Sequence, residues 1–458
     1  MNIRRVLIAN RGEIAVRINR ACKALGVSTV QVYSAADRDS LAVRLADQAI
    51  EIGPAPAAKS YLRIDAIIDA ARASGVDAVH PGYGFLAENG DFADAVVAAG
   101  LIFIGPDGNA IRLLGDKVAA RQMAAEAGVP TVPGSTARLL DVDAGLALAD
   151  RIGYPVMIKA AAGGGGRGIR VVQNAEEFAR QFPQAAAEAS AAFGDGGLYV
   201  EKMISSARHI EVQILGDGQR YVHCFERECS LQRRRQKIWE EAPAFALDAE
   251  VRAAMCTAAV KLAARVAYKG AGTVEFLYDS ATERFYFIEV NTRIQVEHAV
   301  TEMITGLDLV AEMIRIAGGE RLAFEQDDVV ITGHAIECRI NAENPAKNFM
   351  PGPGTITRLV VPSGTDVRFD SMLFEGYTVP PFYDSLLGKL IVHGADRISC
   401  LARLREVLGG LIIEGVPTTI ALHAALAADN EVADGAIDTR FLEAWLERRL
   451  SVPMKAQR

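Results

Sequence analysis

The chain has 458 residues, half of them hydrophobic and 23% charged, and its formal net charge at pH 7 is −8. This composition is typical of a globular protein, and the length predicts about three domains. The acidic balance argues against a nucleic-acid-binding protein, and no apolar run reaches the roughly 18 residues that a transmembrane helix needs. The first residues form an apolar segment without a signal peptide, so we expect a cytoplasmic protein with no membrane partner.

Residues 1–114 alternate short apolar segments with segments of helical spacing. Strands are predicted at 5–10, 27–37, 76–84 and 101–105, and helices at 11–26, 60–75 and 91–100. This alternation predicts βαβ units and a Rossmann-like parallel sheet. Residues 9–13 and 80–89 are polar and follow two of these strands, at the edge where open α/β sheets bind ligands.

The rest of the chain divides into two further regions. A helical pattern that ends at Gly128 opens a predicted central domain, 115–330, which includes a subdomain at about 131–203. Residues 331–447 are rich in strand patterns and Gly/Pro turns, with a last helix at 398–411, and 448–458 form a tail. The predicted fold class is therefore mixed α/β. The six cysteines are scattered, without a C-x-x-C motif, and we expect buried, inert thiols.

A glycine cluster lies within the segment VMIKAAAGGGGRGIRVV. Its glycines formally satisfy G-x-G-x-x-G, but a β-like run follows them instead of a helix, and no Gly-Lys-Ser/Thr is present. We interpret the cluster as a hairpin tip whose backbone N–H groups approach phosphate oxygens, with Lys159 as a fixed positive charge beside them. The alternative is a mobile surface loop.

Two other segments suggest ligand contacts. LYVEKMI, residues 198–204, resembles a strand between domains whose backbone would recognise an adenine edge and whose Glu201 would bind an exocyclic amine; a plain buried strand is the simpler interpretation. Residues 228–243 contain four basic residues in a stretch of six, followed by Glu240 and Glu241. In an acidic chain this pattern favours a pocket for phosphate or bicarbonate, with Lys237 as a point charge, over a nucleic-acid patch.

Polar residues occupy every second position from Glu289 to Glu297. In an extended chain these side chains lie on one face, and pairing across a turn at 279–283 brings Glu275 to the same face. Two carboxylates and the oxygen of Asn291 predict a magnesium site, with residues beyond it to hold an anion and supply a base. The alternative is an amphipathic strand that faces solvent.

Together these segments resemble the ATP-grasp superfamily and, within it, the biotin carboxylase family. The resemblance covers nearly the whole chain and rests on motifs that occur in order: IANRGEIAVRI, HPGYGFLAEN, GDK, KAAAGGGGRG, RHIEVQ, LQRRRQK, GTVEF, FIEVNTRIQVEH and GHAIECRINAE. It implies a Rossmann-like N-terminal domain, a central ATP-grasp domain with a glycine-rich lid and a β-rich C-terminal domain, in agreement with the boundaries above.

The resemblance also implies a reaction. Biotin on a separate biotin carboxyl carrier protein would be carboxylated by bicarbonate at the expense of ATP, through carboxyphosphate, with Mg²⁺ or Mn²⁺ as cofactor. The chain would be a homodimeric subunit of an acyl-CoA carboxylase, acetyl-CoA carboxylase being the favoured one, with carboxyltransferase subunits as further partners. The tail sequence PMKA is similar to a biotin attachment site, but a carrier domain needs more chain around it, and we interpret it as coincidence.

The same resemblance implies site residues. Glu297 matches the base that deprotonates bicarbonate, and Arg339 matches the residue that stabilises the biotin enolate. Metal ligands are Glu275, Glu289 and Asn291; bicarbonate contacts are Lys237, Arg293, Gln295 and the backbone of Val296; biotin contacts are Tyr83, Gly84 and Arg339; catalytic residues are Glu297, Arg293, Arg339 and Lys237. ATP-binding positions are Lys117, Lys159, Gly163, Gly164, Gly165, Gly166, Gly168, Glu201, Lys202, Met203, Ile204, His209, Gln232, Arg235, Glu275 and Glu289. We expect cationic neighbours, Arg293 and Lys237, to keep Glu297 ionised.

The chain departs from the family pattern at two positions. Arg235 stands where the family usually has His, beside the ATP phosphates, and Ala299 stands where it usually has Pro, which would loosen the start of the next helix. A rival interpretation is another ATP-grasp ligase that forms an acyl phosphate, but HPGYGFLAEN and ECRINAE match biotin-side positions. A regulatory subunit without catalysis is a second rival, and the intact acidic and basic site residues argue against it.

Overall fold

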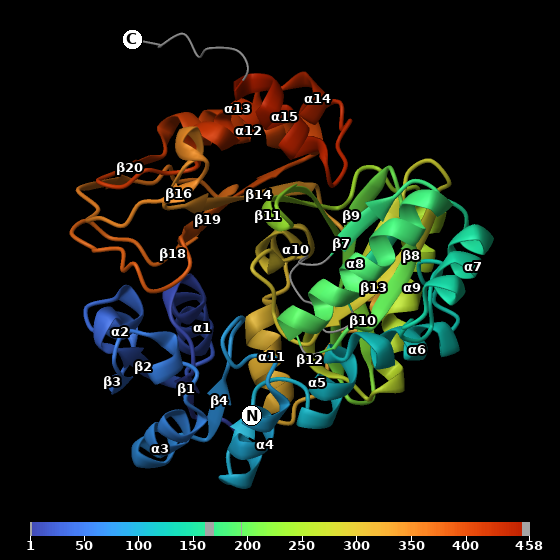
Figure 1. The fold of residues 1–458 in the computed structure, drawn as a ribbon. Coiled ribbons are helices and arrows are strands. Elements are labelled where there is room, and N and C mark those ends of the chain that lie inside the picture. The colour runs from blue at the N-terminus through green and yellow to red at the C-terminus, as the bar shows by residue number, and fades with distance from the viewer. Residues whose placement is uncertain (1, 161–168, 194, 451–458) are drawn as a thin grey trace.

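The computed structural model describes residues 2–160, 169–193 and 195–450 (Figure 1). The N-terminal part is a parallel sheet with strand order β3-β2-β1-β4-β5. Its strands are β1 (Arg5–Ile8), β2 (Ser28–Ser34), β3 (Gln48–Gly53), β4 (Ala78–His80) and β5 (Ile102–Phe103). Its helices are α1 (Gly12–Ala24), α2 (Leu41–Leu45), α3 (Ile64–Ser74), α4 (Gly90–Ala98) and α5 (Gly108–Gly115). The predicted Rossmann-like sheet is confirmed, although β3, a half-exposed edge strand without an apolar run, was not expected.

The polar strand ends of this sheet meet as predicted. Strand order reverses around β1, because β2 lies on one side of it and β4 on the other. Asn10, just after β1, donates from Nδ2 to the carbonyls of Pro81 (2.6 Å) and Tyr83 (2.8 Å), which follow β4. Such a reversal is where open α/β sheets form a crevice. The segment that includes Tyr83 is therefore fixed to the carboxyl edge of β1.

An eight-stranded sheet of order β13-β12-β9-β10-β11-β14-β19-β18 forms the centre of the molecule. All of its pairings are antiparallel. It is continuous across residue 330, so the predicted central and C-terminal regions share one sheet. The strands are β9 (Ala207–Asp217), β10 (Tyr221–Arg233), β11 (Gln236–Ala242), β12 (Lys269–Asp279), β13 (Arg284–Asn291), β14 (His334–Asn341), β18 (Val367–Ser371) and β19 (Leu386–Gly394).

Helices cover this sheet, and a smaller sheet adjoins it. Packed with the large sheet are α6 (Lys117–Glu126), α9 (Ala249–Arg265), α10 (His298–Thr305), α11 (Leu309–Ala317) and α12 (Arg397–Gly410). The smaller sheet, of order β7-β6-β8, consists of β6 (Val156–Ala160), β7 (Ile169–Val172) and β8 (Leu198–Lys202), with α7 (Val142–Ile152) and α8 (Ala175–Phe193). Strands β6 and β7 pair antiparallel, Lys159 opposite Ile169, as the hairpin interpretation requires. Residues Gly163, Gly164, Gly165, Gly166 and Gly168 lie outside the described residues.

The C-terminal region contains more helix than predicted. The expectation that 398–411 would be the last helix is wrong, because α13 (Ile420–Ala427), α14 (Asn430–Ala433) and α15 (Phe441–Leu450) follow it (Figure 1). These helices have ten residues or fewer, and α13 carries apolar residues around its circumference, so the amphipathic period was weak. The remaining elements are the short strands β15 (Glu343–Asn344), β16 (Met350–Pro351), β17 (Arg358–Val360) and β20 (Ile412–Glu414), and the 3₁₀ helices η1 (Ala35–Asp37), η2 (Ala57–Lys59), η3 (Gln326–Asp328) and η4 (Pro345–Lys347).

Two expectations drawn from composition agree with this architecture. All six cysteines are buried and free of disulfides. None of the helices within 2–160, 169–193 and 195–450 is both long enough and apolar enough to cross a bilayer.

Candidate active site

The paired acidic residues of the β12–β13 hairpin lie as the sequence predicts. Glu275 is directly opposite Glu289, and a bulge follows at Phe276. Asn291, the last residue of β13, donates from Nδ2 to Glu275 Oε1 at 3.0 Å, and Lys117 Nζ lies 3.3 Å from Glu289 Oε2. Two carboxylates and an amide oxygen are hard donors of the kind that Mg²⁺ prefers. This donor set therefore fits a magnesium ion, which Glu275, Glu289 and Asn291 would hold and which would supply positive charge for binding an anionic ligand.

The extended geometry predicted beyond Asn291 is wrong. Strand β13 ends there, and residues 292–297 form an irregular segment that enters α10 with Glu297 at the N-cap position. Ile294 is fully buried and Gln295 is 4% exposed, so tertiary packing rather than period-2 alternation places these side chains. Gln295 still reaches Glu275 Oε1, donating from Nε2 at 2.9 Å. The polar residues converge, but through a turn.

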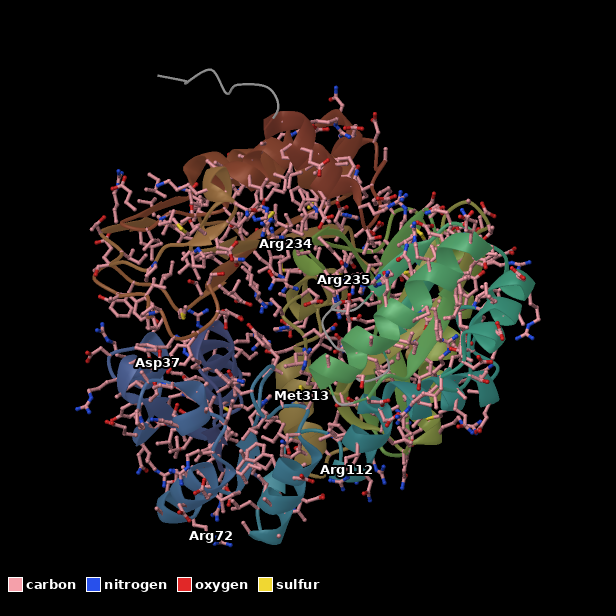
Figure 2. The ribbon with its side chains drawn as sticks, viewed as in Figure 1. Asp37, Arg72, Arg112, Arg234, Arg235 and Met313 are labelled. Carbon is pink, nitrogen blue, oxygen red and sulfur yellow. The ribbon has the colours of Figure 1, made fainter. Side chains whose placement is uncertain are left out.

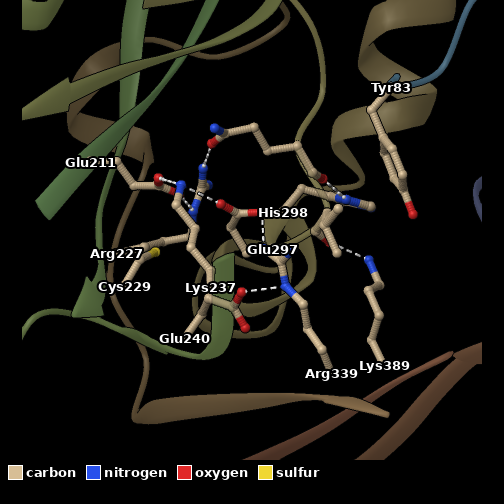
Figure 3. A network of polar contacts seen from close by, with 12 residues as sticks. Tyr83, Glu211, Arg227, Cys229, Lys237, Glu240, Glu297, His298, Arg339 and Lys389 are labelled. Carbon is tan, nitrogen blue, oxygen red and sulfur yellow. Dashed lines mark hydrogen bonds and ion pairs between the residues drawn. The ribbon is translucent and has the colours of Figure 1, made fainter. Parts of the chain in front are cut away.

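Lys237 is the centre of the buried charge cluster (Figure 3). Its Nζ donates to Glu211 Oε2 at 2.5 Å, to Glu297 Oε1 at 2.7 Å and to Glu275 Oε1 at 2.9 Å. Burial lowers the pKa of this ammonium, but the three carboxylates outweigh it and raise the pKa well above its usual range. Lys237 therefore remains a cation and holds three acids together.

Two members of this cluster were not predicted. Arg227 is fully buried on β10 and donates to Glu211 Oε1 at 2.6 Å and to Gln295 Oε1 at 2.9 Å. Glu211 is fully buried on β9. Burial raises the pKa of its carboxyl group, but Lys237 and Arg227 together have the larger effect, and the pKa lies below its usual range. The segments RHIEVQ and ERECS carry these charges inside strands, where alternation alone suggests a solvent-facing side. Burial of charged residues requires paired partners, and only the fold shows them.

Glu297 lies between two cations. Arg339 donates from Nη2 to Glu297 Oε2 at 3.0 Å and from Nε to Glu240 Oε1 at 2.6 Å, while Lys237 holds the other oxygen of Glu297 (Figure 3). Burial raises the pKa of Glu297, and Lys237 and Arg339 lower it, so that it falls below its usual value. The carboxylate is thus ionised at neutral pH, as expected. The contacting partner is Arg339 rather than Arg293, which donates to Glu88 at 2.8 Å instead.

The residues matched to ATP positions lie in two groups. His209 has its Nε2 atom 3.2 Å from Glu275 Oε2, and its Nδ1 atom 3.0 Å from the side chain of Gln232. Burial lowers the pKa of His209, but Glu275 dominates and raises the pKa to about 9. Away from this group, Glu201 on β8 forms ion pairs with Lys159 and Arg121. The carboxylate that was expected to bind an exocyclic amine is therefore neutralised by two side chains of the protein.

The residues that follow Glu201 contact the small-sheet region through the backbone and through Lys202. Lys202 Nζ donates to the carbonyls of Gly153 and Tyr154, both at 3.0 Å. The Met203 N–H donates to the carbonyl of Pro155 at 3.1 Å, and Ile204 follows it as a half-buried residue. Lys202 is the last residue of β8, and the half-buried residues Met203 and Ile204 lead from it toward β9.

The two departures from the family pattern occupy defined places. Arg234 and Arg235 form the tight turn between β10 and β11, with φ of 48° and 67°, and lie near the middle of the molecule (Figure 2). Positive φ at both central residues is typical of a type I′ hairpin and presents Arg235 as an exposed cation at the rim of the site. Helix α10 begins at His298, and Ala299 is fully buried within its first turn; the loosening of the helix start stays a prediction.

A cavity of about 830 Å³ collects most of these groups. Among its lining residues, Tyr83 donates from its hydroxyl to Glu13 Oε2 at 2.5 Å, and Gly84 adopts a φ of 71°. The predicted residues that line the cavity are Tyr83, Gly84, His209, Arg235, Lys237, Glu275, Glu289, Asn291, Arg293, Gln295, Val296, Glu297 and Arg339. Lys117, Lys159, residues 201–204 and Gln232 lie outside its lining. The structure therefore brings the metal, anion and base positions to one cavity with the biotin-side positions.

His423 contacts the backbone of Arg339, and we expect its titration to make the stability of the protein sensitive to acid. Its Nε2 lies 2.8 Å from the carbonyl oxygen of Arg339, and burial lowers its pKa from 6.5 to about 4. As pH falls from 6.5 to about 4, the imidazole of His423 becomes protonated in the unfolded chain but stays neutral in the folded chain. The free energy of unfolding therefore decreases over this range, by about 1.4 kcal/mol per pH unit. We expect His423→Gln to reduce this slope by one proton in denaturant titrations, and an unchanged slope would contradict the assignment.

Family models match the chain in three consecutive parts. The biotin carboxylase N-terminal domain matches residues 2–111, and the carbamoyl-phosphate synthase L chain ATP binding domain matches residues 116–325. The biotin carboxylase C-terminal domain matches residues 337–444. With the donor set and the charge cluster described above, these matches define the chain as an ATP-grasp ligase.

Individual relatives show to which family of ATP-grasp ligases the chain belongs. A biotin carboxylase of Pseudomonas aeruginosa is 53% identical over 443 residues, which cover 96% of this chain and 98% of the relative. The biotin carboxylase–β-γ-ATP complex of Campylobacter jejuni has a TM-score of 0.91 at 46% identity, covering 96% of this chain and 99% of that one. The chain belongs to the biotin carboxylase family.

A second solved structure shows that another kind of carboxylase uses this fold. It is the biotin carboxylase domain dimer of the 2-oxoglutarate carboxylase of Hydrogenobacter thermophilus, in complex with MgADP, ADP and bicarbonate. It has a TM-score of 0.90 at 48% identity, covering 97% of this chain and 98% of that one.

Proposed function

We propose that the chain carboxylates biotin on a separate carrier protein, using bicarbonate and ATP and forming carboxyphosphate. The observation that carries the proposal is the position of Glu297. Its ionised carboxylate is held between Lys237 and Arg339, in the cavity that Glu275, Glu289 and Tyr83 also line. A general base must be ionised and within hydrogen-bond reach of the proton that it removes.

The first step assigns roles to the anion-side residues. Lys237, Arg293, Gln295 and the Val296 backbone hold bicarbonate, and Glu297 removes its proton. The bicarbonate oxygen then attacks the γ-phosphorus of ATP, the bond to the bridging oxygen of ADP breaks, and carboxyphosphate forms. Cations aimed at the developing negative charge lower the barrier most where water is excluded. Lys237 and Arg227, both largely buried, supply such charges.

The second step uses the biotin-side residues. Carboxyphosphate breaks down to CO₂ and phosphate, and the phosphate takes the ureido N–H proton of biotin. The resulting enolate attacks CO₂ and gives carboxybiotin. Arg339, whose guanidinium already bridges Glu240 and Glu297, stabilises the enolate oxygen, and Tyr83 with Gly84 orients the ring. The burial of Arg339 strengthens this interaction, because its charge is poorly screened.

The metal-ligand assignment predicts a specific defect. Glu289 is partly exposed, and within the described residues its ion-pair partner is Lys117, so Glu289→Gln should leave the fold intact. Removing one anionic ligand is expected to raise the Mg²⁺ concentration for half-maximal activity by about 10- to 100-fold. Magnesium titrations of ATP hydrolysis measure this, with Glu283→Gln in the β12–β13 turn as the exposed control. An unchanged magnesium requirement would exclude Glu289 as a ligand.

We propose further that the carboxyl group passes to a carboxyltransferase subunit that acts on an acyl-CoA, acetyl-CoA being the first to test, and that the chain works as a homodimer. Support for the homodimer comes from the biotin carboxylase domain of the 2-oxoglutarate carboxylase, which is a dimer in its solved structure. The acyl-CoA acceptor follows from the family resemblance of the sequence. Carboxylation of 2-oxoglutarate by the reconstituted complex, without carboxylation of acetyl-CoA, would contradict the acyl-CoA assignment.

Steady-state ATP hydrolysis tests the proposed reaction. We expect hydrolysis to require bicarbonate and to increase on addition of free biotin, since biotin consumes the CO₂ formed in the site. Ammonium in place of biotin serves as the second arm, because the ATP-binding model of the chain is named for carbamoyl-phosphate synthase. Stimulation by ammonium but not by biotin would favour an acyl-phosphate–amine ligase and overturn the proposal.

A further inference from the structure

A fully buried lysine lies behind the turn that carries Glu297. Lys389 is on β19, is 0% exposed, and is opposite Arg339 of β14 and Asp370 of β18 in the sheet. Its Nζ donates to the carbonyl oxygen of Val296, one residue before Glu297 (Figure 3). A buried ammonium is costly unless it is paired, so a contact with a single backbone carbonyl requires additional acidic partners.

The acidic partners of Lys389 come from a distant part of the chain. Glu13, in the first turn of α1, places Oε1 3.5 Å from Lys389 Nζ, and Asp370 Oδ2 lies at 4.0 Å. The other carboxylate oxygen of Glu13 accepts the hydroxyl hydrogen bond of Tyr83 at 2.5 Å. A continuous series of polar contacts thus runs from Tyr83 through Glu13 and Lys389 to the carbonyl of Val296.

The surrounding charges keep Lys389 protonated. Burial lowers its pKa, but Glu13, Glu337 and Asp370 outweigh burial and Arg368, and the pKa is raised. Glu337 is fully buried on β14, and neither of its oxygens has a hydrogen-bond partner among the described residues. Burial raises the pKa of Glu337 well above its usual range, and the ion pairs of the ammonium are with Glu13 and Asp370.

We propose that Lys389 is a positioning residue. It couples Tyr83, on the biotin side of the cavity, to Val296 and Glu297, which hold bicarbonate and carry the base. The inference rests on the function proposed above. Its two ends are Tyr83 and the Val296–Glu297 turn, and Glu13 and Lys389 are the links between them. The turn is held at the neighbouring residue as well, because His298 Nδ1 lies 2.7 Å from the carbonyl oxygen of Gln295. A shift of Tyr83 is therefore transmitted to the residues that hold bicarbonate and carry the base.

Lys389→Met tests the position of the turn, since methionine has a similar length without the charge. We expect the KM for bicarbonate to rise about tenfold or more while the KM for ATP changes less than about twofold, because the turn contacts the anion rather than the nucleotide. Arg397→Met is the matched control: it removes a largely buried cation that binds Glu241, whose side chain lies on the opposite face of β11 from Glu240. Equal increases in both constants, or none, would overturn the proposal.

A double-mutant cycle tests the coupling itself. Tyr83→Phe should raise the KM for bicarbonate in the natural sequence, although Tyr83 is on the biotin side, and should add nothing in the Lys389→Met background. If Lys389→Met does not fold, Glu13→Gln replaces it in the cycle, because glutamine keeps an acceptor for Tyr83 and loses the charge. Additive effects would overturn the coupling. Absence of bicarbonate-dependent hydrolysis in the unmodified chain would instead overturn the proposed function and the inference together.

Discussion

Replacing Glu297 with glutamine is expected to lower bicarbonate-dependent ATP hydrolysis by about 10²- to 10⁴-fold, the usual contribution of a positioned base. The amide keeps the shape of the side chain, and its single oxygen can accept from Lys237 or from Arg339 but not from both, because the two cations bind different oxygens of the carboxylate. We expect the fold and ATP binding to persist with some loss of stability. Because the pKa of Glu297 is lowered by these two cations, its ionisation does not limit the rate at neutral pH. The acid limb of the pH–rate profile should therefore not arise from Glu297 above its usual carboxyl range.

The control for this variant is Glu312→Gln. Glu312 is a largely buried acid of α11 that pairs with Arg315, away from the cavity lining. We expect Glu312→Gln to retain full bicarbonate dependence. A Glu297→Gln protein that hydrolyses ATP at the normal rate with bicarbonate would show that another group is the base.

Replacing Lys237 with methionine is expected to have the largest effect on stability. Glu211, Glu275 and Glu297 would face one another without their common cation, and breaking a buried ion pair costs about 3–5 kcal/mol. The stabilisation is present where the carboxylates are ionised, because the pKa of Glu297 and that of Glu275 are both lowered in the folded chain. It is lost as pH falls through the lowered pKa values, so the loss of unfolding free energy should be full at neutral pH and smaller in acid.

Denaturant unfolding of Lys237→Met at pH 7 measures this loss. Exposed Lys261 on α9 provides the matched control, since Lys261→Met removes a cation without leaving a buried acid unpaired. Activity should also fall strongly in Lys237→Met, because bicarbonate loses a cation and the pKa of Glu297 loses the largest of the charges that lower it. Unfolding free energies of the two variants that agree within about 0.5 kcal/mol would contradict the role given to the cluster.

Local patterns predicted the parts of the site that depend on strand pairing. The register that brings Glu275 opposite Glu289 follows from a short turn and period-2 alternation, and both survive in the fold. The conformation of residues 292–297 could not be predicted in the same way. Their sequence alternates like a strand, but the segment is an irregular turn whose path depends on the burial of Ile294. The polar pattern therefore predicted which residues lie close together, but it wrongly predicted an extended strand where the chain forms a turn.

Long-range charge pairing was the part least visible in the sequence. Arg227 and Lys389 belong to strands whose alternation allows a solvent-facing interpretation, yet both are fully buried. Their partners lie far away in sequence: Lys389 pairs with Glu13, and Arg227 reaches Gln295. The packing of α1 against β18 and β19 brings Glu13 to Lys389, and the irregular segment 292–297 brings Gln295 to Arg227.

The central claim is that this cavity transfers a carboxyl group from bicarbonate to biotin at the expense of ATP. The most direct measurement is the incorporation of radiolabelled bicarbonate into biotin by the full chain with ATP and magnesium. The account predicts labelled carboxybiotin, which is absent without ATP and strongly reduced in Glu297→Gln. ATP hydrolysis that proceeds normally without any label on biotin, free or carrier-bound, would contradict it.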